Sequence, residues 1–147
     1  MSPGAEQVQR ETGLLDTNAV VLLGRLDPDH LPRYPVISVI TLAELSVGPL
    51  VTDDASERAA RQARLQETEA AFDPLPVDAA AARAFGRVAA DIRRGGRSMR
   101  PRAFDVLVAA VAIAHGMPLY TCNPRDFAGI TELDLVPVPH PDGSTQV

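Results

Sequence analysis

Four motifs each carry one acidic residue whose type and placement are suited to metal chemistry: Asp16 in GLLDTNAVVLL, Glu44 in VISVITLAELSVG, Asp105 in PRAFDVLVAAVAIAHG and Asp126 in LYTCNPRDF. An aspartate set among apolar residues, as Asp16 is, costs folding free energy unless it is paired, capping or bound to a cation. Two carboxylates about 4 Å apart repel each other by about 4 kcal/mol at an effective dielectric constant of about 20. A divalent cation relieves that repulsion, and hard carboxylate oxygens favour Mg²⁺ or Mn²⁺ over zinc. If the fold gathers these acids, Asp16 is therefore a metal ligand.

The elements that would position the acids alternate along the chain. Short apolar runs typical of buried strands cover 13–16, 35–39, 74–77, 118–122 and 134–138. Helical patterns cover 18–25, 41–49, 55–72, 78–94 and 103–115, with a short turn at 124–128. This alternation predicts an α/β fold with a mostly parallel central sheet and helices on both faces. Sites in such sheets form beyond the carboxyl ends of the strands, where these acids would converge.

Helix boundaries offer another explanation for most of the acids. The run from Thr41 to Glu44 matches a capping box, and the run from Asn123 to Asp126 has the same logic with proline at the first helical position. Asp105 near a helix start is favoured by the helix dipole, by roughly 0.3 to 1 kcal/mol. Capping explains Asp16 less well, because the residues after it, Thr17 or Asn18, can cap the next helix. Asp78 is the expected N-cap of the helix over 78–94.

In order and spacing, the segments LLDTNAVVL, TLAELSVG, FDVLVAAVAIAHGMPLYT and TCNPRDF resemble the successive motifs of PIN-domain ribonucleases, and within them the VapC toxins of bacterial toxin–antitoxin pairs. The resemblance spans about residues 13–138 and implies a three-layer α/β/α domain with metal-dependent endoribonuclease activity. It makes Asp16, Glu44 and Asp105 the three principal acids and Asp126 the more variable fourth, with Asn123 as the alternative contact. The site-lining polar residues that it implies are Thr17, Asn18, Thr121 and Asn123.

The resemblance also implies a substrate, a cofactor and a protein partner. A VapC-like toxin cuts RNA, either tRNA or mRNA, with Mg²⁺ or Mn²⁺ as cofactor, and is neutralised by a VapB-like antitoxin. We expect the antitoxin to lie in a groove built from the segments 41–50 and 55–72, and we expect a cytoplasmic homodimer with no membrane association. The alternative is a catalytically silent PIN-like domain that only binds a partner.

Net charge and composition limit the other functions that the chain could have. A net charge of −5 argues against coating nucleic acid through bulk positive charge. RNA would instead be guided locally, and the candidates for this role precede the third motif: Arg93, Arg94, Arg97, Arg100 and Arg102. The alternative is that these arginines complement a helix end or decorate a solvated loop. All 14 basic residues are arginine, which disfavours receiver domains and haloacid-dehalogenase-like phosphatases, because both use a lysine.

The remaining expectations concern Cys122 and the chain ends. A single cysteine excludes an intrachain disulfide, and its place at the end of an apolar strand indicates core packing rather than catalysis. No apolar run is long enough to span a membrane. We expect a flexible leader over 1–12, the folded domain over 13–139 and a flexible tail over 140–147.

Overall fold

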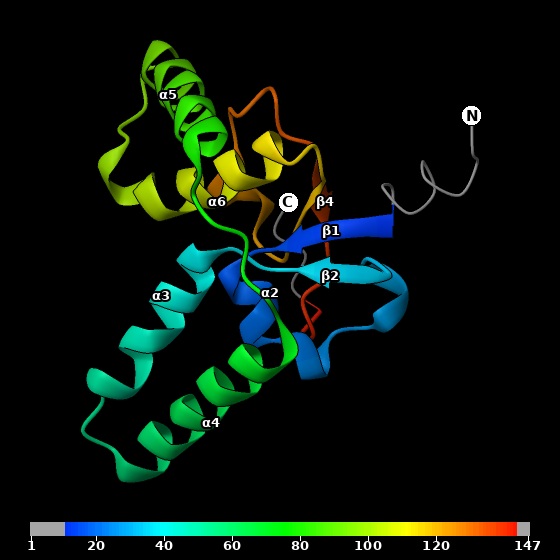
Figure 1. Cartoon of the computed structure of the whole chain (residues 1–147), viewed down its shortest axis with the longest axis vertical. Helices are drawn as coiled ribbons and strands as arrows, with labels where there is room; N and C mark the ends of the chain where they lie inside the picture. Colours follow the sequence, from blue (N-terminus) through cyan, green and yellow to red (C-terminus); the bar gives the residue numbers. More distant parts are fainter. Residues whose placement is uncertain (1–10, 144–147) are drawn as a thin grey trace.

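The computed structural model describes residues 11–143, and these form a four-stranded, all-parallel sheet between two layers of helices (Figure 1). The strands are β1 (Thr12–Leu15), β2 (Tyr34–Val36), β3 (Leu119–Thr121) and β4 (Leu135–Pro137), in the order β2-β1-β3-β4. The helices are α2 (Thr17–Val21), α3 (Val39–Val47), α4 (Ala55–Ala71), α5 (Ala79–Arg94) and α6 (Ala103–Ala114). Single 3-10 turns occupy η1 (Leu23–Arg25), η2 (Pro28–His30), η3 (Gly48–Leu50), η4 (Arg100–Arg102) and η5 (Pro124–Phe127).

Two hydrophobic cores lie on opposite faces of the sheet because successive strand residues point in opposite directions. Leu14 of β1 packs in one core with residues of α5 and α6, whereas its neighbour Leu15 packs in the other core with residues of α2 and α3. Figure 1 shows the corresponding layers, with α5 and α6 on one side of the sheet and α2, α3 and α4 on the other. The structure therefore confirms the three-layer α/β/α fold with a parallel sheet.

The structure confirms the predicted start of α5 and differs from the prediction for the helix over 18–25 and for the strands over 74–77 and 35–39. Asp78 caps α5, accepting the Ala81 N–H at 2.9 Å. The helix predicted over 18–25 divides after Val21 into α2 and η1. The strand predicted over 74–77 is reduced to one bridge, in which Leu75 exchanges backbone hydrogen bonds with Ile37 and Val39 at 2.9 Å each.

The strand predicted over 35–39 ends early because a helix begins inside it. β2 stops at Val36, and Ser38 is the N-cap of α3, its hydroxyl accepting the Thr41 N–H at 3.4 Å. Thr41 thus lies within the first turn of α3 rather than before it. The capping box proposed for Thr41 and Glu44 is therefore wrong, which leaves both side chains free for other contacts.

The chain ends fall partly outside the described residues. Residues 1–10 of the predicted leader and 144–147 of the predicted tail lie beyond the part that the structure describes. Within it, β1 begins at Thr12, and residues 140–143 form a turn attached by an Arg25–Asp142 ion pair of 2.7 Å. In the described part, no helix is long and apolar enough to cross a membrane.

Gly13 in the central strand β1 leaves no room for a side chain. A Cβ at this position would overlap the ring of Tyr120 on β3 and lie 3.1 Å from Cβ of Pro32. We expect Gly13→Ala to lower the free energy of unfolding by about 1 to 3 kcal/mol, the usual cost of overpacking. Urea denaturation would measure the loss, with Gly24→Ala as the control, since a Cβ at Gly24 meets nothing within 4 Å. Equal stability of both variants would mean that the Tyr120 ring moves aside without cost.

Candidate active site

The carboxyl edge of the sheet at β1 and β3 is where the chain leaves in opposite directions, to β2 on one side and to β4 on the other. Open parallel sheets form their sites at such a switch point. In Figure 1 the arrowheads of β1 and β2 point toward the side from which α3 departs. All four predicted acids stand at this edge: Asp16 after β1, Glu44 in α3 after β2, Asp126 after β3, and Asp105 in the first turn of α6.

Asp16 is buried, with 5% of its surface exposed, and both of its carboxylate oxygens are engaged. Oδ1 accepts the Ala19 N–H at 2.8 Å, so Asp16 is the N-cap of α2, contrary to the prediction that Thr17 or Asn18 would cap it. Oδ2 accepts the Thr121 hydroxyl at 2.5 Å. A carboxylate offers about four acceptor positions. Capping therefore leaves each oxygen able to contact a cation as well.

The Thr121 hydroxyl has a defined direction. Its oxygen accepts the backbone N–H of Asn123 at 2.9 Å, so its single proton is available for Asp16. Thr121 is fully buried at the end of β3. This hydrogen bond joins the ends of two adjacent central strands and holds the Asp16 carboxylate in one orientation.

Glu44 is held by a pair of threonines. Thr17 donates its hydroxyl proton to Glu44 Oε1 at 2.8 Å, and its oxygen lies 3.0 Å from the Thr41 hydroxyl. Because Thr17 has given its only proton to the carboxylate, Thr41 is the donor of the second bond. Thr41 was interpreted from the sequence only as a cap. Its spacing of three residues from Glu44, which places both on one helix face, was the signal that it belongs to this group.

Electrostatics show that the four acids lie in one neighbourhood. The pKa of Asp16 is raised from 3.8 to about 6, mainly by burial, with further increases from the charges of Asp126 and Glu44. Hydrogen bonds from Thr121 and Ala19 oppose this increase.

The pKa of Asp105 is likewise raised to about 6 by burial and by the three other acids, Asp126 first, against the opposing charge of Arg102. The charge of Asp126 thus raises the pKa of both Asp16, which is buried, and Asp105, which is half-buried. Its backbone N–H bonds the Asn123 carbonyl at 3.1 Å, whereas the Asn123 side chain makes no capping bond.

The donor set suits a partly hydrated hard cation. Among residues 11–143, no three His, Cys, Asp or Glu side chains are close enough to form a ready-made metal cage. Mg²⁺ usually keeps several waters and binds through one or two carboxylates together with substrate phosphate oxygens. Burial is the main cause of the raised pKa values of Asp16 and Asp105, and repulsion from the other acids adds to it. A bound cation relieves that repulsion. The residues present therefore fit Mg²⁺ or Mn²⁺.

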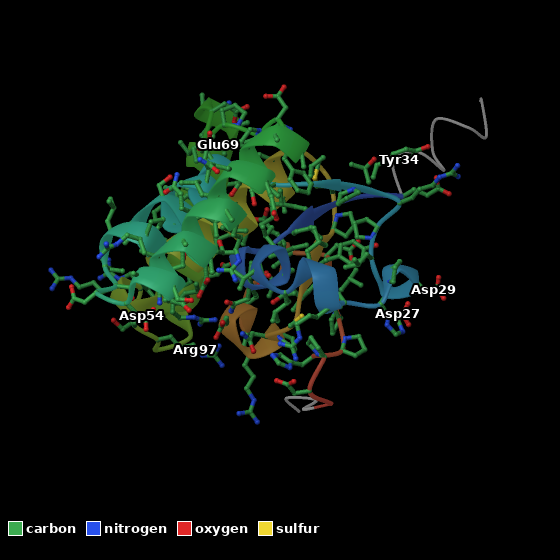
Figure 2. All side chains as sticks on the ribbon, turned by 90° about the horizontal axis from the view of Figure 1, so that it is seen from below. Asp27, Asp29, Tyr34, Asp54, Glu69 and Arg97 are labelled. Carbon is green, nitrogen blue, oxygen red and sulfur yellow. The ribbon has the colours of Figure 1, made fainter. Side chains whose placement is uncertain are left out.

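The arginines before α6 have different local roles. Arg97 donates to the Ala128 carbonyl at 2.8 Å, and Arg102 donates to the Asp126 carbonyl at 2.5 Å. Both therefore hold the η5 segment that carries Asp126, and Arg97 projects from the loop beside it (Figure 2). Arg94 pairs with Asp91 at 3.0 Å. Arg100 is exposed, and no hydrogen bond or ion pair of its side chain is found within the described range.

The remaining residues singled out from the sequence, Asn18, Asn123 and Cys122, lie at or near the ends of β1 and β3. Asn18 is exposed at the start of α2 and Asn123 is half-buried after β3. Cys122 is buried in the core shared with Leu15 and Ile37, and burial raises the pKa of its thiol. The thiolate needed for nucleophilic catalysis is thus disfavoured, as expected from the sequence.

A PIN-domain family model matches residues 13–133. The chain belongs to the PIN-domain family. This PIN domain is 39% identical over 121 residues to Ribonuclease VapC5 of Mycobacterium tuberculosis, covering 80% of this chain and 87% of the relative. It is 30% identical to Ribonuclease VapC4 of the same organism, covering 78% and 85%.

Solved structures agree with this assignment. The PIN domain superposes on a chain of VapBC-5, a member of the VapBC family of toxin–antitoxin systems from Mycobacterium tuberculosis, with a TM-score of 0.73 and 32% identity. That match covers 87% of this chain and 99% of the other. DNA-bound VapBC from Salmonella typhimurium matches with a TM-score of 0.69 and 25% identity, covering 84% and 96%.

Proposed function

We propose that this PIN domain is a divalent-metal-dependent endoribonuclease that acts as a toxin and is neutralised by a VapB-like antitoxin. The observation that carries the proposal is the acid cluster at the carboxyl edge of the sheet, in which Asp16 and Asp105 both have a pKa near 6. The named VapC ribonucleases among its relatives supply the reaction class. Carboxylates that have raised pKa values and gather at one edge of a sheet are more typical of functional sites than of helix caps alone.

The four acids have distinct parts in this proposal. Asp16 and Asp105 would hold the ion, and Glu44 and Asp126 would complete its shell directly or through water. A bound Mg²⁺ or Mn²⁺ lowers the pKa of water and neutralises charge on a scissile phosphate. Thr121 orients Asp16, and the Thr41–Thr17 pair orients Glu44. The two carboxylates therefore need little rearrangement to bind the ion when RNA arrives. Hydrolysis by water, with the 3′ oxygen leaving, gives 5′-phosphate and 3′-hydroxyl products.

The test is cleavage of defined tRNA and messenger transcripts by antitoxin-free protein, with Mn²⁺ and with EDTA. We expect cuts with 5′-phosphate ends that need the metal and disappear in Asp105→Asn protein. Asp134→Asn is the matched control, because Asp134 is an exposed aspartate immediately before β4, at the opposite edge of the sheet. If folded parent protein binds Mn²⁺ yet leaves a broad RNA set uncut, the chain is a silent binding module instead.

The antitoxin has a candidate surface along α4. A cavity of about 480 Å³ lies between α4 and the α2–η1 segment, with apolar residues such as Val20, Val21 and Phe72 beside Arg64 and Glu67. Its opposite wall comes from α2 and η1, whereas the groove predicted over 41–50 and 55–72 corresponds to a second cavity of about 600 Å³, lined by Pro49 and Leu50 on one side and by α4 on the other. In support, the structural relatives are toxin–antitoxin complexes. The predicted homodimer stays a prediction.

Of the three arginines nearest to α6, Arg100 is the best placed to contact RNA phosphate, because Arg97 and Arg102 are bonded to backbone carbonyls. We expect Arg100→Ala to weaken RNA binding and to reduce the magnitude of the negative slope of log affinity against log salt by about one. Arg83→Ala is the control, since Arg83 is an exposed arginine toward the other end of α5. Titrations at several salt concentrations measure both values. An identical slope in the two variants would leave Arg100 as a solvated surface residue.

A further inference from the structure

A small apolar pocket adjoins the acid cluster. It has a volume of about 280 Å³ and is lined by Ala43, Glu44 and Val47 of α3 and by Phe104 of α6. Glu44 belongs to the acid cluster, and Phe104 immediately precedes Asp105 in the first turn of α6. An occupant of this pocket therefore contacts Glu44 directly and lies against the residue that precedes Asp105.

Phe104 differs from every other phenylalanine in the chain. Phe127 is buried in the core against α6, and Phe85 and Phe72 pack against the two cores. Phe104 is 61% exposed and belongs to neither core. Further burial of this ring would be favourable, so an apolar or aromatic occupant of the pocket would gain contact with it.

The chemistry of the pocket selects among possible occupants. Three of its four lining residues are apolar, none is basic, and the fourth is the Glu44 carboxylate, so a phosphate group is repelled. The volume lies near the lower end of small-ligand sites, which suits one flat ring rather than several turns of a partner helix. An aromatic ring at the mouth offers the face on which an unpaired nucleobase stacks.

We propose that Phe104, with Ala43 and Val47, receives one unpaired base of the RNA, next to the phosphodiester held at the acids. The proposal rests on the proposed ribonuclease function and adds a requirement for single-stranded RNA at the cleavage point. Because Phe104 and Asp105 are consecutive residues in one helix, a base stacked on the ring sets the position of its own phosphate relative to Asp105. Phe104 is thus a positioning and specificity residue.

The experiment compares two probes that carry the same phosphates. One is a fluorescein-labelled uridine hexamer, and the other is the same ribose–phosphate chain without bases; binding is measured in EDTA at low salt so that neither is cut. We expect parent protein to prefer the hexamer with bases, and Phe104→Ala to weaken its binding about 5- to 150-fold while leaving the abasic chain unaffected. Phe104→Tyr keeps the ring and should retain the preference. Leu50→Ala is the control, since Leu50 is 84% exposed but does not line this pocket.

A second measurement locates the base directly. RNA containing 4-thiouridine should form a photo-crosslink to residue 104 within the tryptic peptide 103–125, and this crosslink should disappear in Phe104→Ala. The inference is overturned if Phe104→Ala keeps the preference for bases or if Leu50→Ala loses it equally. It is also overturned if Phe104→Ala weakens only antitoxin binding or self-association, which would make the pocket a protein contact.

The two proposals fail differently. Parent protein that binds and cuts RNA, together with a Phe104→Ala variant indistinguishable from it, removes the base pocket and leaves the ribonuclease intact. Parent protein that neither binds nor cuts any RNA removes the proposed function and the pocket with it.

Discussion

Asp16→Asn protein should cleave RNA at least about 100-fold more slowly than its parent while being more stable at neutral pH. The loss of activity follows from removing a ligand charge at the proposed metal site, since even outer-shell changes at such sites cost about 10- to 100-fold. The amide keeps the shape of the side chain. Its oxygen can still accept the Ala19 N–H that Asp16 accepts at 2.8 Å, and its NH₂ can donate to the Thr121 hydroxyl.

The gain in stability follows from the direction of the pKa change. The folded-state pKa of Asp16 is about 6 and its ordinary value is 3.8, so between these values the folded protein binds more protons than the unfolded chain. Stability then falls as pH rises through this window, and the full cost, on the order of 3 kcal/mol, is present above about pH 6. Below about pH 4 both states are protonated and the cost vanishes. Replacing the carboxylate removes part of this cost at neutral pH only.

Urea denaturation of parent and Asp16→Asn protein at about pH 7.5 and about pH 4 measures this difference. Asp53→Asn is the control, because Asp53 is exposed in the loop before α4 and should change stability little at either pH. Lower stability of Asp16→Asn at neutral pH would mean that the cap and the Thr121 hydrogen bond outweigh the burial of charge. Unchanged cleavage would remove Asp16 from the metal site.

The affinity for Mn²⁺ should fall about 100-fold between about pH 7 and about pH 5. Asp16 and Asp105 both have a pKa near 6, raised chiefly by burial and also by the other acids, and both must lose a proton to bind a cation. Each proton contributes about a tenfold change over this range. Binding near pH 6 should also release protons, and cleavage should rise with pH through the same interval.

Calorimetric titration with Mn²⁺ in buffers of different ionisation enthalpy measures both the affinity and the number of protons released. In Asp105→Asn protein the pH dependence should shrink to about tenfold, because one titrating ligand remains. Asp134→Asn should keep the full dependence. An affinity that is flat between about pH 5 and pH 7 in the parent would show that Asp16 and Asp105 do not hold the ion.

The sequence by itself determined the class of the fold and the identity of the acids. Alternating strand and helix patterns placed Asp16 at the end of the first predicted strand, Glu44 beyond the second and Asp126 after the fourth. In a parallel sheet these positions share one edge, as the structure shows. The sequence also predicted the N-cap of α5 at Asp78. It predicted the end of α6 as well, where Gly116 has a φ of +63° that suits glycine. These features depend on residues a few positions apart, so local sequence patterns are enough to predict them.

Only the tertiary structure decided how the acids are held. The Thr121–Asp16 hydrogen bond joins residues 105 positions apart, and the Thr17–Glu44 bond joins residues 27 apart. The single bridge left of the strand predicted over 74–77 has a similar origin, because Leu75 pairs there with the chain around Ser38.

The same applies to the surroundings of the site. Arg97 and Arg102 were predicted as RNA contacts, but they donate to the carbonyls of Asp126 in η5 and of Ala128 just after it, 24 to 31 residues away in the chain. Phe104 has a sequence context that suits a core residue, yet it is exposed beside Glu44. Hydrogen bonds between distant segments, and the burial of side chains between them, depend on how whole layers pack. Local sequence periodicity does not predict which side chains that packing brings together.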